Sequence, residues 1–213
     1  MEKEERQPNP VYKETLWEWR SFGRPDPNIY NNISSLPIKV GKPIKMLDRY
    51  LFNDAGCEVN IKLRDKDLKI KSLHYKTDTG IEQWTTEAYN FPISANVFRK
   101  VTSALKVEIK GREVEDGKQL LSILSHASKS IKVIDVQKQR ELYMWPSGSI
   151  DAVTIELAEI SKPECITTIS VEHQSLEKVS KALELLQLVS TSMKVLNYVD
   201  CLKVWVEQGK LVK

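Results

Sequence analysis

The feature that most constrains the fold is a predicted hairpin over residues 58–75, EVNIKLRDKDLKIKSLHY. Apolar and charged residues alternate along both of its halves, a pattern typical of strands with one apolar and one polar face. If the chain turns symmetrically about Lys66 and Asp67, Leu63 lies opposite Ile70 on the apolar face. The hairpin therefore predicts an antiparallel sheet that buries one of its sides.

The other face of this hairpin carries four cations with no acid among them. In the symmetric register, Arg64 lies opposite Lys69, and Lys62 lies opposite Lys71. Like charges set directly opposite each other destabilise a sheet by about 0.2–1 kcal/mol for each pair. The four side chains therefore call for an anionic ligand. A register slip of one residue would mix the two faces and remove this argument.

Other predicted strands repeat the split between an apolar and a polar side. In LWEWRSFG, residues 16–23, Glu18 and Arg20 alternate with Trp17 and Trp19. Polar residues of equal parity recur in three later strands: Lys138 and Arg140; Thr154 and Glu156; Thr168, Ser170 and Glu172. Polar strand faces of this kind are most often simply solvated. The alternative is a sheet closed into a barrel, whose charged interior suits a polyanionic ligand with a divalent metal ion.

The order of the predicted elements favours an α+β fold, because strands and helices come in blocks and do not alternate strictly. Strands are expected within residues 45–91 and 130–173, and helices within 92–105, 116–127, 175–188 and 191–208. Ser94 is a candidate helix N-cap. We expect a polar N-terminal tail over residues 1–12 and a single domain over 13–213. Four prolines in residues 23–43 predict a long loop, with room for one helical turn.

Composition excludes several classes of partner and location. The chain has 213 residues and a formal net charge of only +3, so no strong overall field favours nucleic acid or an anionic membrane. The N-terminus lacks an apolar signal segment, and no apolar run approaches the length of about 18 residues that a membrane span needs. Three widely separated cysteines favour a reducing compartment. We therefore expect a cytoplasmic protein.

The order of these features resembles the CYTH domain proteins, the triphosphate tunnel metalloenzyme superfamily. That family's E-x-E-x-K signature aligns with Leu16-Trp17-Glu18-Trp19-Arg20, its L-R-I-R strand is similar to residues 61–64, and its L-x-K strand is similar to 68–71. Its S-Y-x-x-L helix is similar to the segment with Tyr198 and Leu202. The resemblance implies a closed antiparallel β-barrel, a tunnel of about eight strands with helices packed outside.

The resemblance also implies roles for individual residues. Glu18 and Arg20 would be catalytic, and Mg²⁺ or Mn²⁺ would be the cofactor. The phosphates of the substrate would be bound by Lys62, Arg64, Lys69, Lys71, Lys138 and Arg140. The metal ligands would be Glu18, Glu87, Glu156 and Glu172, with Glu82 a weaker alternative to Glu87.

Two positions depart from the family pattern. Leu16 stands where the first acid of the signature belongs, and Ser170 stands where a late strand would carry another acid. Metal-dependent hydrolysis of a triphosphate-containing small molecule, such as tripolyphosphate, a nucleoside triphosphate or thiamine triphosphate, is the first hypothesis. The second is a polyphosphate-binding or organic phosphate-binding protein that has lost part of its metal site. A structural domain with solvated strand faces is the third.

These hypotheses also set the expected partners. Under the first two hypotheses we expect a phosphorylated small molecule or polyphosphate as the partner, and neither nucleic acid nor a membrane. A homodimer is possible.

Overall fold

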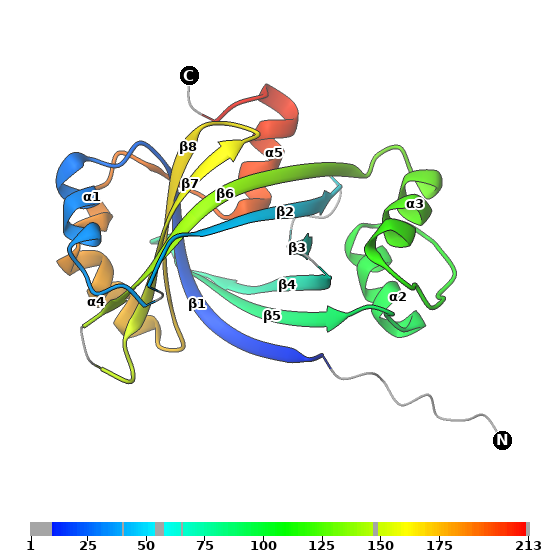
Figure 1. Ribbon diagram of the computed structural model, residues 1–213, viewed down its shortest axis with the longest axis horizontal. Coiled ribbons are helices and arrows are strands. Elements are labelled where there is room, and N and C mark those ends of the chain that lie inside the picture. Colours follow the sequence, from blue (N-terminus) through cyan, green and yellow to red (C-terminus); the bar gives the residue numbers. More distant parts are fainter. Residues whose placement is uncertain (1–9, 40, 54–57, 65, 147–148, 212–213) are drawn as a thin grey trace. The chain divides into compact units, whose positions relative to one another are not determined.

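The computed structural model describes residues 10–39, 41–53, 58–64, 66–146 and 149–211. Most of the expected polar tail, residues 1–9, lies outside the described residues, as does Cys57. The described elements run in the following order: β1 (Tyr12–Gly23), α1 (Pro27–Ser34), β2 (Ile44–Phe52), β3 (Val59–Arg64), β4 (Asp67–Lys76), β5 (Glu82–Asn90), α2 (Ala95–Ala104), α3 (Gly117–Ala127), β6 (Lys132–Trp145), β7 (Val153–Lys162), β8 (Ile166–His173), α4 (Leu176–Leu185), the 3₁₀ turn η1 (Leu188–Ser190), β9 (Lys194–Val195) and α5 (Tyr198–Gln208) (Figure 1).

The strands form one sheet in the order β5-β4-β3-β2-β6-β7-β8-β1-β9. Strand β5 also pairs with β1, so the sheet closes on itself as an antiparallel β-barrel. The predicted α+β barrel is confirmed, with the two-residue strand β9 as an addition at β1. By compactness the chain divides into two units, one with residues up to 14, 48–72 and 86–134, and one with 15–47, 73–85 and 135–213.

The first unit packs the apolar face of β3 and β4 against two helices that lie together in Figure 1, α2 and α3. Its core combines strand residues Leu51, Ile61, Leu68 and Ile70 with helix residues Val97, Phe98, Val101, Leu120 and Leu124. Ser94 caps α2, as predicted, by accepting a hydrogen bond from the backbone of Val97. The even-numbered side chains of β3 consequently point to the other face of the sheet.

The second unit packs odd-numbered residues of β1, β7 and β8 against helices α1 and α4. Its core combines Trp19, Ile155, Ile169 and Val171 with Ile29, Ile33, Val179, Ala182 and Leu183. Helix α5 packs on the opposite face of β1, where Tyr198 and Trp205 meet Phe22 edge to face. The even-numbered polar residues of these strands therefore share their face with α5.

Three local predictions are wrong. The proline-rich segment holds an eight-residue helix, α1, because Pro27 fits the first helical turn and Asp26 caps it. The last helix begins at Tyr198 and not near Thr191, because Asn197 caps it and residues 194–195 pair with β1 instead.

Within the described residues, no helix is both long enough and apolar enough to cross a membrane.

The third correction concerns the register of the basic hairpin. Lys62 lies opposite Lys69, and Asn60 lies opposite Lys71, a shift of two residues from the symmetric register. The last pair of the hairpin is Arg64 and Asp67, so the turn lies one residue earlier in the chain than expected and keeps its length of two residues. Because side chains alternate with a period of two, this shift preserves both faces of the hairpin.

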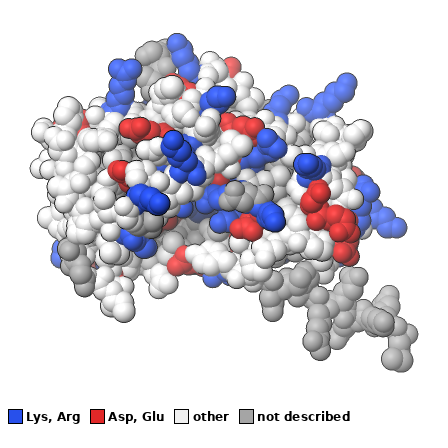
Figure 2. Space-filling model, in the orientation of Figure 1, with Lys and Arg blue, Asp and Glu red and all other residues white. Residues whose placement is uncertain are grey.

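On the face shown in Figure 2, many lysine and arginine side chains are interspersed with aspartate and glutamate. An anion site in this chain has to come from local geometry.

Candidate functional site

The most concentrated set of buried charges lies in the second unit, on the face of β1, β6, β7 and β8 opposite α1 and α4. Strand register sets it up: Glu18 lies opposite Glu172, and Ser170 lies between Arg20 on β1 and Glu156 on β7. The exposed fractions of Glu18 and Arg20 are 6% and 7%. This polar face is therefore no solvated surface, and the charged residues of 16–23 line an interior.

Arg20 is the centre of this cluster. Its Nε donates to Glu18 Oε1 at 2.7 Å, and its Nη1 donates to Glu156 Oε1 at 3.1 Å. Its Nη2 donates to Glu172 Oε1 at 3.4 Å, and Nη1 also reaches Thr168 Oγ1 at 3.2 Å. The three nitrogens of one guanidinium thus hold the three carboxylates that the family resemblance assigns to a metal ion in this unit.

Glu156 receives cations on both of its oxygens. Lys138 Nζ lies 3.3 Å from Oε1, which also accepts from Arg20, and Arg140 Nη1 lies 2.9 Å from Oε2. Burial alone would raise the pKa of Glu156, but attraction to Lys138, Arg20 and Arg140 outweighs it and holds this pKa well below its ordinary value. Glu156 therefore stays ionised although its exposed fraction is 5%.

Arg20 stays charged for the matching reason. Burial would lower its pKa, but attraction to the surrounding carboxylates, Glu18 and Glu156 first among them, raises this pKa well above its ordinary value. The cluster joins Arg20, Lys138 and Arg140 to an equal number of carboxylates, Glu18, Glu156 and Glu172. Its formal charges consequently balance.

Tyr198, at the first turn of α5, packs over the cations of this cluster. The Arg20 guanidinium carbon lies 4.9 Å from the ring centroid, and Lys138 Nζ lies 5.1 Å from it. Lys138 also donates to the Tyr198 hydroxyl at 3.2 Å. These cation–π contacts fix both side chains in a buried setting. The sequence motif that pointed to Tyr198 thus marks a residue that contacts the cluster.

The residues present do not fit a divalent metal ion. Among the described residues, no group of three or more His, Cys, Asp and Glu side chains is arranged to hold one. Of the two departures from the family pattern, Ser170 lies in this cluster, where its hydroxyl donates to Glu172 Oε1 at 3.4 Å, and Leu16 shares the parity of Glu18 on β1. Neither adds a carboxylate to the three that Arg20 already contacts.

A second ion cluster lies in the first unit on β2 and β3. Asp48 is fully buried and accepts from Arg64 Nη2 at 2.7 Å and from Lys62 Nζ at 3.4 Å. Lys62 Nζ also lies 5.4 Å from the ring centroid of Tyr50. Lys69 shares this face, directly opposite Lys62. Within the hairpin itself, Asp67 lies opposite Arg64, so the expectation that the four hairpin cations have no acid among them is wrong.

The sequence reasoning missed Asp48 because it paired β3 only with β4. Asp48 lies opposite Arg64 on the other neighbour, β2. Its parity with Tyr50 in KMLDRYLF was the available signal, since Leu51 alternates to the helix side. An acid on the buried face of a strand that neighbours a basic strand predicts an ion pair of this kind.

Glu87 and Glu82 each have partners of their own. Glu87, in the first unit, meets Lys100 at 3.1 Å and Lys13 at 3.4 Å, on the side of β5 where Tyr89 joins the helix-facing core. Glu82, in the second unit, is buried and accepts from Trp84, Asn197 and Lys76. The structure thus gives Glu87 lysine partners, while Glu18, Glu156 and Glu172 converge on Arg20.

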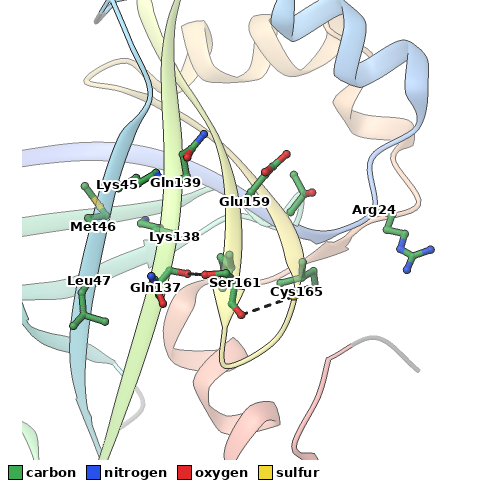
Figure 3. A pocket seen from close by; sticks show the side chains of 13 residues that line it. Arg24, Lys45, Met46, Leu47, Gln137, Lys138, Gln139, Glu159, Ser161 and Cys165 are labelled. Carbon is green, nitrogen blue, oxygen red and sulfur yellow. Dashed lines mark hydrogen bonds between the residues drawn. The ribbon is translucent and has the colours of Figure 1, made fainter.

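The second unit also has an open cavity of about 740 Å³ on the side of the sheet that Gln139, Glu159 and Thr167 face. In Figure 3, Gln139 and Glu159 project from β6 and β7 to the same side. Residues 45–47, 137–139, 159–161, 165–167 and Arg24 line it. Glu159 has the parity of Leu157, which belongs to the core on this side of the sheet.

Comparison with known proteins identifies the fold. No family model matches the sequence, and no curated protein matches it either. Among solved structures, the putative adenylyl cyclase HpAC1 from Hippeastrum, described as having a dominant triphosphatase activity, is 17% identical over 93% of this chain and 97% of its own, with a TM-score of 0.50. A conserved hypothetical protein from Pyrococcus furiosus is 12% identical over 87% of this chain and 98% of its own, with a TM-score of 0.51.

The protein PH1012 from Pyrococcus horikoshii OT3 is similar as well, with 16% identity over 86% of this chain and 98% of its own and a TM-score of 0.50. At these identities the likeness concerns the fold. The chain thus has the fold of the CYTH-type proteins, as its sequence motifs predicted.

Proposed function

We propose that the protein binds a small molecule that carries a chain of phosphates, with the basic face of β3 and β4 as its contact surface. The observation that carries this proposal is the set of four cations on that face, Lys62, Arg64, Lys69 and Lys71. Asp48 on β2 and Asp67 on β4 both lie opposite Arg64 on this face. An anion bound there would relieve the repulsion between the directly opposed Lys62 and Lys69.

The geometry favours an extended anion over a single phosphate. Lys69 and Lys71 project from one strand about 7 Å apart, since a strand rises by about 3.3 Å per residue. Asp48 accepts hydrogen bonds from Nε and Nη2 of Arg64, and these two contacts fix the orientation of the guanidinium group. A triphosphate group spreads its charge over a comparable length and would contact cations on both strands.

Hydrolysis of a phosphoanhydride bond is the second candidate function. Two observations favour it: three carboxylates converge on one cation in the second unit, and the similar protein from Hippeastrum is described as a triphosphatase. Glu18 and Arg20 would be the residues to test, because neutralisation of phosphate oxygens by fixed cations is a main source of catalysis in phosphoryl transfer.

The test is thermal unfolding at low salt with tripolyphosphate, ATP or thiamine triphosphate, and with inorganic phosphate as the reference. A ligand that binds only the folded state stabilises it by about 2.7 kcal/mol at a hundredfold excess over Kd. The double change Lys69→Gln/Lys71→Gln should reduce this stabilisation, whereas Lys181→Ala, an exposed lysine on α4, should leave it unchanged.

The same samples are then screened for released phosphate with and without Mg²⁺ or Mn²⁺. Release that depends on Glu18 would select the hydrolase over the binding protein. A melting temperature that none of the phosphate compounds moves, even at millimolar concentration, would remove the support for both functions.

A further inference from the structure

We propose that Arg20 is a built-in cation that takes the place of the divalent metal ion in this fold, so that the protein binds its phosphate ligand without a metal. This inference rests on the proposed function, because it concerns how the same protein meets a phosphate chain. It goes beyond it by assigning the Glu18, Glu156 and Glu172 carboxylates a partner within the chain.

The geometry of the guanidinium carries the first step. Each of its three nitrogens is directed to a different carboxylate, at 2.7, 3.1 and 3.4 Å. These carboxylates come from three strands, β1, β7 and β8, so a single side chain contacts all three of them. A lysine ammonium is a compact point charge on a flexible stem, whereas the planar guanidinium fork offers donors in several fixed directions. The replacement of the family's lysine by Arg20 therefore changes what this position can hold.

The charge balance of the cluster carries the second step. Glu156 already has Lys138 and Arg140 as partners in addition to Arg20. A dication placed among these carboxylates would meet Arg20 at contact distance, and Arg20, Glu18 and Glu156 are buried, so the repulsion between the two cations is weakly screened. Its binding would require the Arg20 side chain to move out of the cluster and give up its contacts with Glu18, Glu156 and Glu172.

The neighbouring positions carry the third step. Ser170 lies in register with both Arg20 and Glu156, at the middle of the cluster. An acid at residue 170 would add negative charge beside Arg20, but serine adds none, and its hydroxyl instead donates to Glu172. Leu16, on the same side of β1, adds no charge either. Acids at positions 16 and 170 would give the cluster a net negative charge, and this chain has neither.

The first experiment measures Mn²⁺ binding to the full chain by electron paramagnetic resonance, with no phosphate compound present. We expect no tight site in the wild type and a new site in Arg20→Ala, where the three carboxylates lose their shared partner. Arg20→Lys should give an intermediate affinity. A tight Mn²⁺ site in the wild type that Glu18→Gln removes, and that the matched change Glu87→Gln leaves intact, would overturn the inference.

The second experiment does not depend on whether Arg20→Ala folds. The affinity of the wild type for tripolyphosphate is measured by calorimetry in excess EDTA and again with Mg²⁺. We expect binding in EDTA to be at least as tight as in Mg²⁺, and affinity that rises more than about tenfold with Mg²⁺, equal to about 1.4 kcal/mol, would overturn the inference. Absence of binding under both conditions would instead contradict the proposed function, while the Mn²⁺ measurement still decides the role of Arg20.

Discussion

Arg20 and Glu156, 136 residues apart in the chain, meet at 3.1 Å between Nη1 and Oε1, and each side chain is only 6% exposed. A buried ion pair is a weak source of net stability, because desolvation offsets much of the attraction. Removing one member is costly nevertheless, since the other charge stays buried without its partner. The pair therefore makes the fold of the second unit dependent on a complete ion cluster.

The first prediction is that Glu156→Gln destabilises the protein by about 3–5 kcal/mol, because Arg20, Lys138 and Arg140 lose their common partner. Urea unfolding measures this change. The matched control is Glu159→Gln on the same strand, whose side chain is exposed and should change stability by less than about 0.5 kcal/mol. If both variants lost the same free energy of unfolding, the ion cluster would contribute no more to stability than an exposed carboxylate does.

The second prediction concerns pH and follows from the lowered pKa of Glu156. A carboxyl whose pKa is lower in the folded than in the unfolded state binds fewer protons when folded, so its contribution to stability is present above the unfolded pKa. That contribution is lost as the pH falls below the ordinary value of 4.5 toward the lower folded pKa. The wild type should therefore lose more stability on acidification through this range than Glu156→Gln does.

Urea midpoints at a series of pH values, measured for both proteins, test this difference. If the two stability curves run parallel from neutral pH down to the acid transition, Glu156 cannot be the group that titrates.

The third prediction concerns the ion cluster of the first unit. Arg64→Ala should destabilise the fold by about 3–5 kcal/mol, because Asp48 is fully buried and loses two of its hydrogen bonds. Arg64→Lys should recover part of the loss, since an ammonium keeps the charge but not the two-pronged contact. Lys66→Ala, an exposed lysine in the adjacent turn, is the control and should be close to neutral.

Chemical unfolding monitored by tryptophan fluorescence compares the three variants. If Arg64→Ala were as stable as Lys66→Ala, water would have to reach Asp48 and replace the hydrogen bonds that Arg64 donates.

Alternation within single strands was enough to predict which side chains share a face. The hairpin register was wrong by two residues, yet Lys62 and Lys69 stayed on one face because the pleat repeats every two residues. Asp48 was missed because its partner Arg64 lies across a strand pair that no turn residue specifies. Helix α1 was missed because prolines at the start of a helix and prolines in a loop look alike in a sequence.

The central place of Arg20 could not be predicted from the sequence at all. The sequence motif gave Arg20 a catalytic role together with Glu18, and parity placed it on the polar side of β1. Whether its guanidinium points to a ligand or to Glu18, Glu156 and Glu172 depends on side-chain rotamers and on the spacing of three strands. Those quantities exist only in the folded chain.

The last prediction combines Arg20 with the leucine that replaces the first acid of the family signature. Leu16→Glu places a carboxylate on the side of Glu18 about 7 Å along β1. With Arg20 present, we expect this change alone to create no Mn²⁺ site, because the internal cation still balances the cluster. With Arg20→Ala in the same protein, the four acids together should bind Mn²⁺ more tightly than Arg20→Ala alone.

Mn²⁺ titrations of the wild type, both single variants and the double variant form a cycle, which separates the coupling of the two positions from their individual effects. Thr15→Glu is the matched control, because residue 15 is exposed and projects from the opposite side of β1. A site created by Leu16→Glu while Arg20 is intact would show that the guanidinium yields its position to a metal ion. Equal affinities with Leu16→Glu and Thr15→Glu in the Arg20→Ala background would instead show that residue 16 does not reach the carboxylates.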